Sequence, residues 1–362
     1  MRSFIAGSAF VGLVAALPQQ INVAAVEALP TPSVLGPELA AKSTPAVTYN
    51  PTSAASAAAA AISTAPPSIE KRDATCAPQP GGAGPIPGSG SVDEYLKKDS
   101  ILGQEAEQAG TPTGYVQSFK NLQAGSQQIY YLTYRTIDSG TYDVDTCAAF
   151  CDSEKFCNGF NIYYERDPSV DPSASCPNPP PITNVKCALF GYPVGAAAAT
   201  NAGQWRGPED ANGEAFHVVI AGSNGYSKLA PVRPAPTVPG FSGPVSLPAA
   251  INAPPEADTY NGMKLYNDGP FDPSVCAAAC QAQTKFDKEV LVDSEGNYRA
   301  CNFFNAYVLL KNDVPQGTYC SFYTREWDPS YAVNTGYFWE SDVYKVVSSF
   351  SYTLDPLDPG HI

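Results

Sequence analysis

The sequence predicts an α+β protein of two small disulfide-rich modules, each an antiparallel sheet with one cysteine-bearing helix. Three observations predict this fold class. The chain of 362 residues has ten cysteines, an even number that favours disulfides in an exported protein. The run C-A-A-x-C occurs twice, at residues 147–151 and 276–280, and so does C-N-x-F-N-x-Y, as CNGFNIY (157–163) and CNFFNAY (301–307). The chain therefore contains an internal duplication.

A helix is expected around each C-A-A-x-C run, over residues 144–155 and 273–285. Asp143 and Asp272 precede the runs, where a carboxylate can accept hydrogen bonds from the free N–H groups of a first helical turn. Pro273 follows at a position where its missing N–H costs nothing. Cysteines at i and i+4 lie on one helix face, so each helix can be bonded twice to whatever that face covers.

The repeated strings are expected to be strands, because aromatic and branched residues alternate along CNGFNIYYE and CNFFNAYVLL. One face would carry Phe160, Ile162, Tyr164, Phe304, Ala306 and Val308, and the other Asn161, Tyr163, Asn305 and Tyr307. Further strands are expected at residues 187–192, 215–222, 318–324 and 342–354.

The N-terminal residues predict export. Residues 1–16 combine Arg2, an apolar run and small residues, as a signal peptide does; the alternative is a buried N-terminal helix. Residues 17–72 are rich in Ala, Pro, Ser and Thr and cannot bury enough side chain to offset their ordering entropy, so we expect a disordered pro-segment. It ends at the dibasic pair Lys71 and Arg72, where a furin-like or kexin-like protease would cut. All ten cysteines follow this pair, which favours processing there over an incidental surface pair.

The charge and the apolar runs restrict the partners. A net charge of −14 makes nucleic acid and anionic membranes poor partners. No apolar stretch after residue 16 is long enough to span a bilayer, and the end TLDPLDPGHI lacks the hydrophobic tail of a lipid-anchor signal. We expect a secreted protein, extracellular or associated with the cell wall, without membrane insertion.

The remaining segments divide the chain. Residues 73–127 carry few core residues and are expected to be a loosely structured lead-in tethered by Cys76. Residues 229–256 contain eight prolines and predict a semi-rigid extended spacer; the alternative is an ordered crossover packed along both modules. Module 1 is expected over residues 128–228, module 2 over 257–355, and a short tail over 356–362.

The order of these blocks, [YF]-D-x-x-x-C-A-A-x-C, then C-N-x-F-N-x-Y, then C-x-[LF]-[FY], resembles the PAN/apple domain family. In that family a helix bearing C-x3-C is bonded to the central sheet. The segment AFHVVIAGSNGYSK (215–228) and the IEKR boundary (69–72) resemble the two-module type that fungi secrete.

The resemblance implies a nested pairing, in which the first helix cysteine bonds to the last strand cysteine and the second helix cysteine to the middle one. The implied pairs are Cys147–Cys187, Cys151–Cys157, Cys276–Cys320 and Cys280–Cys301. Cys76 and Cys176 remain and are paired by elimination. Cys176 lies in a Pro-rich insertion that module 2 lacks.

No catalytic residue, metal site or cofactor is predicted. His217 lies in an apolar run that favours a strand residue over a catalytic base, and His361 lies in the tail. The strings ERDP (165–168) and REWDP (325–329) offer carboxylates for glycoside hydrolysis, but they fall at different places in the two modules. We interpret both as turns at strand ends.

Binding is therefore the expected class of function, since the family resemblance implies protein or carbohydrate ligands and aromatic faces stack on sugars and anchor interfaces. Core packing is the alternative for each single residue. The candidate ligand-binding residues are Asn161, Tyr163, Tyr164, Trp205, Asn305, Tyr307, Trp327 and Trp339. The expected ligand is an extracellular polysaccharide or protein. The alternatives are a structural component of the cell wall or matrix and, less favoured, a secreted hydrolase that uses acidic residues.

Overall fold

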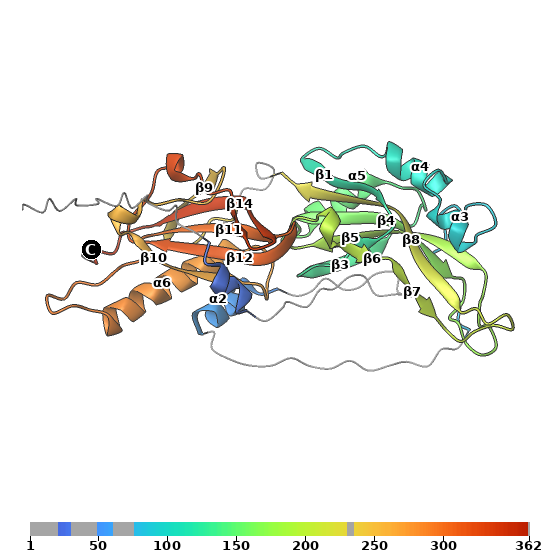
Figure 1. Ribbon diagram of the computed structural model, residues 1–362, viewed down its shortest axis with the longest axis horizontal. Helices are drawn as coiled ribbons and strands as arrows, with labels where there is room; N and C mark the ends of the chain where they lie inside the picture. Colours follow the sequence, from blue (N-terminus) through green and yellow to red (C-terminus); the bar gives the residue numbers. More distant parts are fainter. Residues whose placement is uncertain (1–20, 30–48, 61–75, 230–234, 361–362) are drawn as a thin grey trace, which may run out of the picture.

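The computed structural model describes residues 21–29, 49–60, 76–229 and 235–360. Two six-stranded antiparallel sheets make up most of it, accompanied by few helices and five disulfides (Figure 1). The predicted signal peptide, the dibasic pair Lys71 and Arg72, and His361 lie outside the described residues. Within those residues no helix is both long and apolar enough to cross a membrane. Five disulfides are typical of proteins that fold in an oxidising compartment, as expected for an extracellular protein.

The first sheet, blue-green to yellow in Figure 1, has the strand order β1-β8-β4-β5-β3, and β7 also pairs with β8. Its strands are β1 (Tyr115–Leu122), β3 (Tyr131–Thr136), β4 (Gly159–Pro168), β5 (Pro181–Phe190), β7 (Gly203–Arg206) and β8 (Phe216–Lys228). A separate small ladder joins β2 (Gly125–Ser126) to β6 (Ala199–Asn201).

The second sheet, orange to red in Figure 1, repeats this order as β9-β14-β11-β12-β10, with β13 also paired to β14. Its strands are β9 (Phe241–Leu247), β10 (Tyr260–Tyr266), β11 (Phe303–Lys311), β12 (Val314–Tyr323), β13 (Gly336–Trp339) and β14 (Asp342–Leu354). Each strand of the first sheet thus has a counterpart in the second, so the duplication covers the whole sheet and not only the cysteine-bearing blocks.

Both expected cysteine-bearing helices are present, as α5 (Val144–Ser153) and α6 (Pro273–Val290). Asp143 accepts from the amide of Thr146 at 3.0 Å and Asp272 from the amide of Ser274 at 2.9 Å, as the capping prediction requires. α6 extends past residue 285 because its last turn is held to the sheet: buried Asp287 accepts from Asn261 of β10 at 3.1 Å. The remaining helices are α1 (Val23–Glu27), α2 (Pro51–Ala60), α3 (Val92–Leu96) and α4 (Ile101–Gln108), with 3-10 turns at Ala196–Ala198, Pro255–Ala257 and Pro329–Tyr331.

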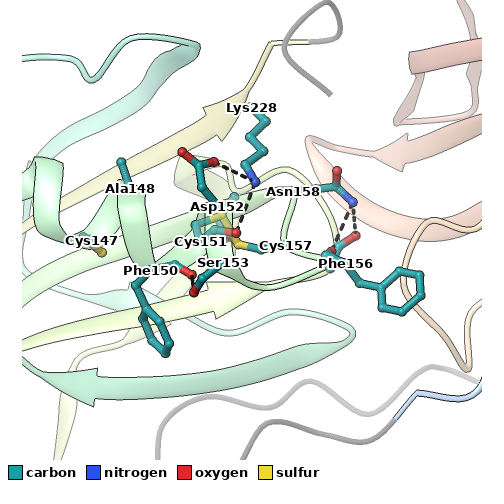
Figure 2. The surroundings of a disulfide bond; sticks show 12 residues. Cys147, Ala148, Phe150, Cys151, Asp152, Ser153, Phe156, Cys157, Asn158 and Lys228 are labelled. Carbon is teal, nitrogen blue, oxygen red and sulfur yellow. Dashed lines mark hydrogen bonds and ion pairs between the residues drawn. A yellow bond between two sulfur atoms is a disulfide. The ribbon is translucent and has the colours of Figure 1, made fainter. Parts of the chain in front are cut away.

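The five disulfides are the same pairs that the family resemblance and elimination indicate. Each of α5 and α6 is bonded twice, once to a central strand of its sheet and once to a cysteine two residues before the neighbouring strand. The pairs are Cys147–Cys187, Cys151–Cys157, Cys276–Cys320 and Cys280–Cys301. The fifth pair is Cys76–Cys176. Figure 2 shows how Lys228, at the end of β8, donates to the carbonyl of Cys151 at 3.1 Å and pairs with Asp152 at 3.0 Å. The last strand of the first sheet is thereby held to the end of α5.

The predicted lead-in, residues 73–127, is not loosely structured where it is described. It contributes β1 to the first sheet, and α3 and α4 bury Tyr95, Leu102 and Ala106 completely. Its glycines lie close against β5: a Cβ on Gly81 would lie 2.1 Å from the side chain of Asn184, and one on Gly84 would lie 2.9 Å from the carbonyl oxygen of Thr183. Few large side chains are needed where glycines let backbones approach, so the composition alone was misleading.

The predicted spacer, residues 229–256, is an ordered part of the second sheet from residue 235 onward. β9 pairs with β14, and Ala235, Val238 and Phe241 are buried in the second core. Pro244 is tolerated because β9 pairs only with β14 and the ladder has a register shift at that point. From residue 235 onward the segment is packed on the second sheet and is not an extended spacer, while residues 230–234 lie outside the described residues. The sheets begin at Tyr115 and Phe241 instead of at residues 128 and 257.

The two halves touch directly. Tyr192, fully buried, donates to the carbonyl of Gly269 at 2.8 Å, and the amide of Phe271 donates to the carbonyl of Gly191 at 3.3 Å. Ile129 and Tyr192 from the first half belong to the core of the second. This contact replaces the expected picture of two modules held apart on a stiff spacer.

Candidate functional site

Five of the eight predicted ligand-binding residues lie in the repeated strings and are buried: Asn161, Tyr163, Tyr164, Asn305 and Tyr307. Trp327 is also buried, at 5% exposure, with its indole N–H on the hydroxyl of Thr259 at 3.0 Å. Only Trp205 and Trp339 present a large exposed ring, at 65% and 42% exposure. In the chain as described, these residues of the repeated strings are covered, as the core-packing alternative expects, and present no surface to a ligand.

The repeated asparagine has the same structural task in both halves. Asn161 Oδ1 accepts from the amide of Ser126 at 2.7 Å, and its Nδ2 donates to Ser223 Oγ and the carbonyl of Asn224, both at 2.9 Å. Asn305 repeats all three bonds with the counterparts Ile251, Ser349 and Phe350. The β4–β8 ladder has a register shift between Ile162 and Tyr164, and the β11–β14 ladder has one between Ala306 and Val308, which places a bulge in β8 and in β14. Each asparagine joins this bulge to a segment outside the six-stranded sheet.

Asn305→Ala is expected to lower the free energy of unfolding by about 1–3 kcal/mol, because it leaves the buried amide of Ile251 without its acceptor. Urea unfolding measures the loss. Asn212→Ala, on an exposed turn, is the control and should change stability by less than about 0.5 kcal/mol. Equal effects of the two substitutions would contradict the structural task assigned to Asn305.

The ERDP string is not a turn but the end of β4, and its charged side chains are buried. Lys186 of β5 donates to Glu165 and lies 3.9 Å from Asp167, whose carboxylate accepts from Asn184 at 2.7 Å. Burial and the nearby charge of Asp167 raise the pKa of the Glu165 carboxyl to about 8. One cation thus faces two carboxyl groups in a dry environment. REWDP does lie in a turn, with Asp328 capping the 3-10 turn that begins at Pro329.

Trp205 lies on β7, an edge strand that the cysteine pattern did not reveal. Its indole stacks on the imidazole of His217 in β8, with ring centroids 4.0 Å apart and an angle of 12° between the planes. Burial and the charge of Arg166 lower the pKa of His217, which favours the neutral ring. Arg166 is itself fixed, since it donates to the carbonyls of Gly90 and His217 at 2.9 and 2.7 Å. The exposed indole therefore rests on a rigid base.

A cavity of about 760 Å³ opens beside this stacked pair. Its polar lining comes from different parts of the first half: Asp93, Arg166, Asn178, Glu209 and Glu214. The turn between β7 and β8 is held by Asp210, whose Oδ1 accepts from the amides of Asn212 and Glu214 at 2.8 and 3.0 Å. Those backbone bonds lower the pKa of Asp210. An aromatic face with convergent carboxylate, amide and guanidinium groups is suited to a polar ligand with one apolar face.

The second sheet carries an equivalent ring. Gly203 of β7 pairs with Val219, and Gly336 of β13 pairs with Lys345. Val219 and Lys345 occupy the same position on β8 and β14. The residues that lie two positions after these glycines, Trp205 and Phe338, therefore correspond. Phe338 is 77% exposed. The sequence does contain the signal, as N-x-G-x-[WF] in NAGQW (201–205) and NTGYF (334–338).

The asparagine and glycine of this repeat explain its geometry. Asn201 accepts from the amide of Gly203 and Asn334 from that of Gly336, each at 3.1 Å. Both glycines have positive φ, and a Cβ on either would lie 2.0 Å from a backbone oxygen of the neighbouring strand. Only glycine fits there, so the repeat fixes where each exposed ring begins.

No protein-family model, no curated protein and no solved structure matches this chain. The resemblance to PAN/apple domains thus stays a prediction based on the motifs and their spacing. Among the described residues, no group of three or more His, Cys, Asp or Glu side chains could hold a metal ion.

Proposed function

We propose that this is a secreted, non-catalytic protein that binds extracellular polysaccharide through the cavity beside Trp205. The observation that carries the proposal is the exposed indole, stacked on His217 and facing a lining of carboxylate, amide and guanidinium groups. Sugar rings have an apolar face for an indole and hydroxyl groups for polar side chains, so both features have a use in one ligand. Phe338, the exposed ring at the equivalent position of the second half, offers a second, weaker contact on the same chain.

We also propose that the two halves are PAN/apple-like modules of the type that fungi secrete. Support comes from the doubly bonded helix in each half and from the order of the repeated blocks. A protein ligand is the second candidate, because Phe338 and Trp339 expose apolar surface outside the polar cavity.

Trp205→Ala is expected to weaken polysaccharide binding at least about fivefold, since tryptophans that anchor an interface contribute more than about 1 kcal/mol. Phe338→Ala should weaken it less. Co-sedimentation of the purified secreted protein with insoluble β-glucan, chitin, cellulose and mannan, followed by titration of the soluble oligosaccharide, measures the change.

Leu357→Ala, which removes a side chain of similar exposure outside the cavity, is the matched control. Unchanged polysaccharide binding in Trp205→Ala would overturn the assignment of the site. Retention of secreted proteins but of none of the four polysaccharides would favour the protein ligand. Release of sugar that disappears in Glu209→Gln or Glu214→Gln would favour the hydrolase hypothesis instead.

A further inference from the structure

The predicted pro-segment, expected to be disordered, has two described pieces that pack against the second half. α1 and its flanks bury Ile21, Val23 and Val26 on the second sheet. α2 packs along α6, beside which it is drawn in Figure 1. Just before α2, Tyr49 donates to Asp272 at 2.8 Å and its ring meets Phe156 at 4.7 Å between centroids. These pieces are ordered because their apolar residues find a surface elsewhere in the chain, which composition could not show.

The surface under α1 is aromatic. Tyr307 and Tyr319 stack with ring centroids 4.8 Å apart, and Tyr344 and Leu309 lie in the same cluster. All four are almost fully buried, and the apolar side chains of α1 pack directly against them. Tyr307 is thus a predicted ligand-binding residue that the chain's own N-terminal segment covers.

Polar contacts complete the fit between α1 and this surface. The amide of Asn22 donates to the hydroxyl of Tyr319 at 3.2 Å. Glu27 accepts from the hydroxyl of Tyr344 and from Lys311, the latter at 2.6 Å. Burial and Glu27 raise the pKa of the Tyr344 phenol to about 12. The surface therefore recognises a short apolar helix that carries one carboxylate.

The corresponding face of the first sheet is covered differently. Lys186 stands where Tyr319 stands in the second sheet, and Glu165 where Leu309 stands. The segment over that face follows Cys76, and its Gly82 donates to Asn184 at 2.7 Å. This segment follows the predicted cut after Arg72, and the disulfide Cys76–Cys176 attaches it to the first half. A cut after Arg72 would leave that cover attached, whereas it would sever the cover of the second sheet, together with α2, from the rest of the chain.

We propose that residues 21–29 are a removable cover on an aromatic docking surface of the second sheet, formed by Tyr307, Tyr319, Tyr344 and Lys311. Cleavage after Arg72 turns an intramolecular contact into a bimolecular one, so the contact loses its high effective concentration. After the cut, the three branched side chains at α1 have to offset the loss of translational and rotational freedom on association, so the segment leaves the surface on dilution. Cleavage thereby opens the surface to a partner segment of the same chemistry, an apolar helix with an acidic side chain.

The test compares the full secreted chain before and after cutting by a dibasic-specific protease, with Lys71→Ala/Arg72→Ala as the uncut control. Hydrogen exchange at residues 305–309 and nitration of Tyr319 and Tyr344, located by mass spectrometry, report the state of the surface. In the uncut chain both tyrosines should be protected at every protein concentration. After cutting, nitration should rise roughly tenfold or more on dilution to about 1 μM, because the buried tyrosine rings become accessible to the reagent.

A synthetic peptide of residues 17–30 should restore the protection of Tyr319, and the same peptide with Glu27→Gln should do so less well. In the uncut chain, Val23→Asp should expose Tyr319 without any cut, whereas Ala24→Asp, at an exposed position of the same helix, should not. Nitration of Tyr319 in the uncut natural chain would overturn the cover. Full protection of the cut protein after dilution would overturn its release.

Discussion

Replacing Lys186 by methionine is expected to lower the free energy of unfolding by about 3–5 kcal/mol, the cost of leaving a buried charge without its partner. Lys186 is 1% exposed and is the cation between Glu165 and Asp167. Methionine fills much of the same volume, so the loss reports the charge and not a cavity. Urea unfolding followed by tryptophan fluorescence measures it.

The loss should depend on pH. The pKa of Glu165 is raised to about 8 in the folded protein, above its ordinary value of 4.5, so its contribution to stability is present below pH 4.5 and is lost as the pH rises to 8. Lys186 lowers the pKa of Glu165, so without it the Glu165 carboxyl holds its proton more strongly, and Lys186→Met should therefore cost less at pH 5 than at pH 8. Lys264→Met, at an exposed position of β10, is the control and should have little effect at either pH. A loss below about 1 kcal/mol at pH 8 would contradict the ionic cluster.

Removing the Cys276–Cys320 disulfide by paired alanine substitutions is expected to cost about 4 kcal/mol, because the bond restricts a long loop in the unfolded chain. The sequence separation is 44 residues, and both sulfur atoms lie in the second core. Thermal and urea unfolding of the secreted variants measure the effect.

The matched comparison is the removal of Cys151–Cys157, which spans only 6 residues and should cost about 2 kcal/mol. Both bonds join a cysteine-bearing helix to buried residues, so their surroundings are similar. An equal or reversed order of the two losses would show that strain or packing, and not loop length, sets the contribution of these disulfides.

The sequence predicted the elements that carry a strong local signal. Asp143 and Asp272 mark the starts of α5 and α6, and the alternating strings around Phe160 and Phe304 became β4 and β11. β1 and β9 were missed because they carry no cysteine and lie in segments rich in glycine or proline. Runs of glycine in a sequence predict loops, yet in this fold glycines allow close contact between backbones.

The candidate site was harder to predict because exposure depends on the tertiary structure. Trp205 and Trp327 are the same residue type, but Trp205 lies on an edge strand and Trp327 packs under a 3-10 turn against Tyr331. The side-chain amide of Asn161 could have bound a ligand, but its Nδ2 group donates instead to residues at the bulge in β8. The repeat N-x-G-x-[WF] could have located the exposed rings, had its spacing been compared between the halves.

The docking of α1 also depends on the order in which the chain is synthesised. Asn22 is hydrogen-bonded to Tyr319, 297 positions later, and Glu27 to Tyr344, 317 positions later. The first described helix to be synthesised therefore docks on a surface whose residues are synthesised near the end of the chain. The first sheet can close once β8 has emerged, whereas the second must wait for β14. Ile21, Val23 and Val26 can therefore be buried only after the second sheet is complete, and a chain with α1 in place is a chain whose second sheet has formed.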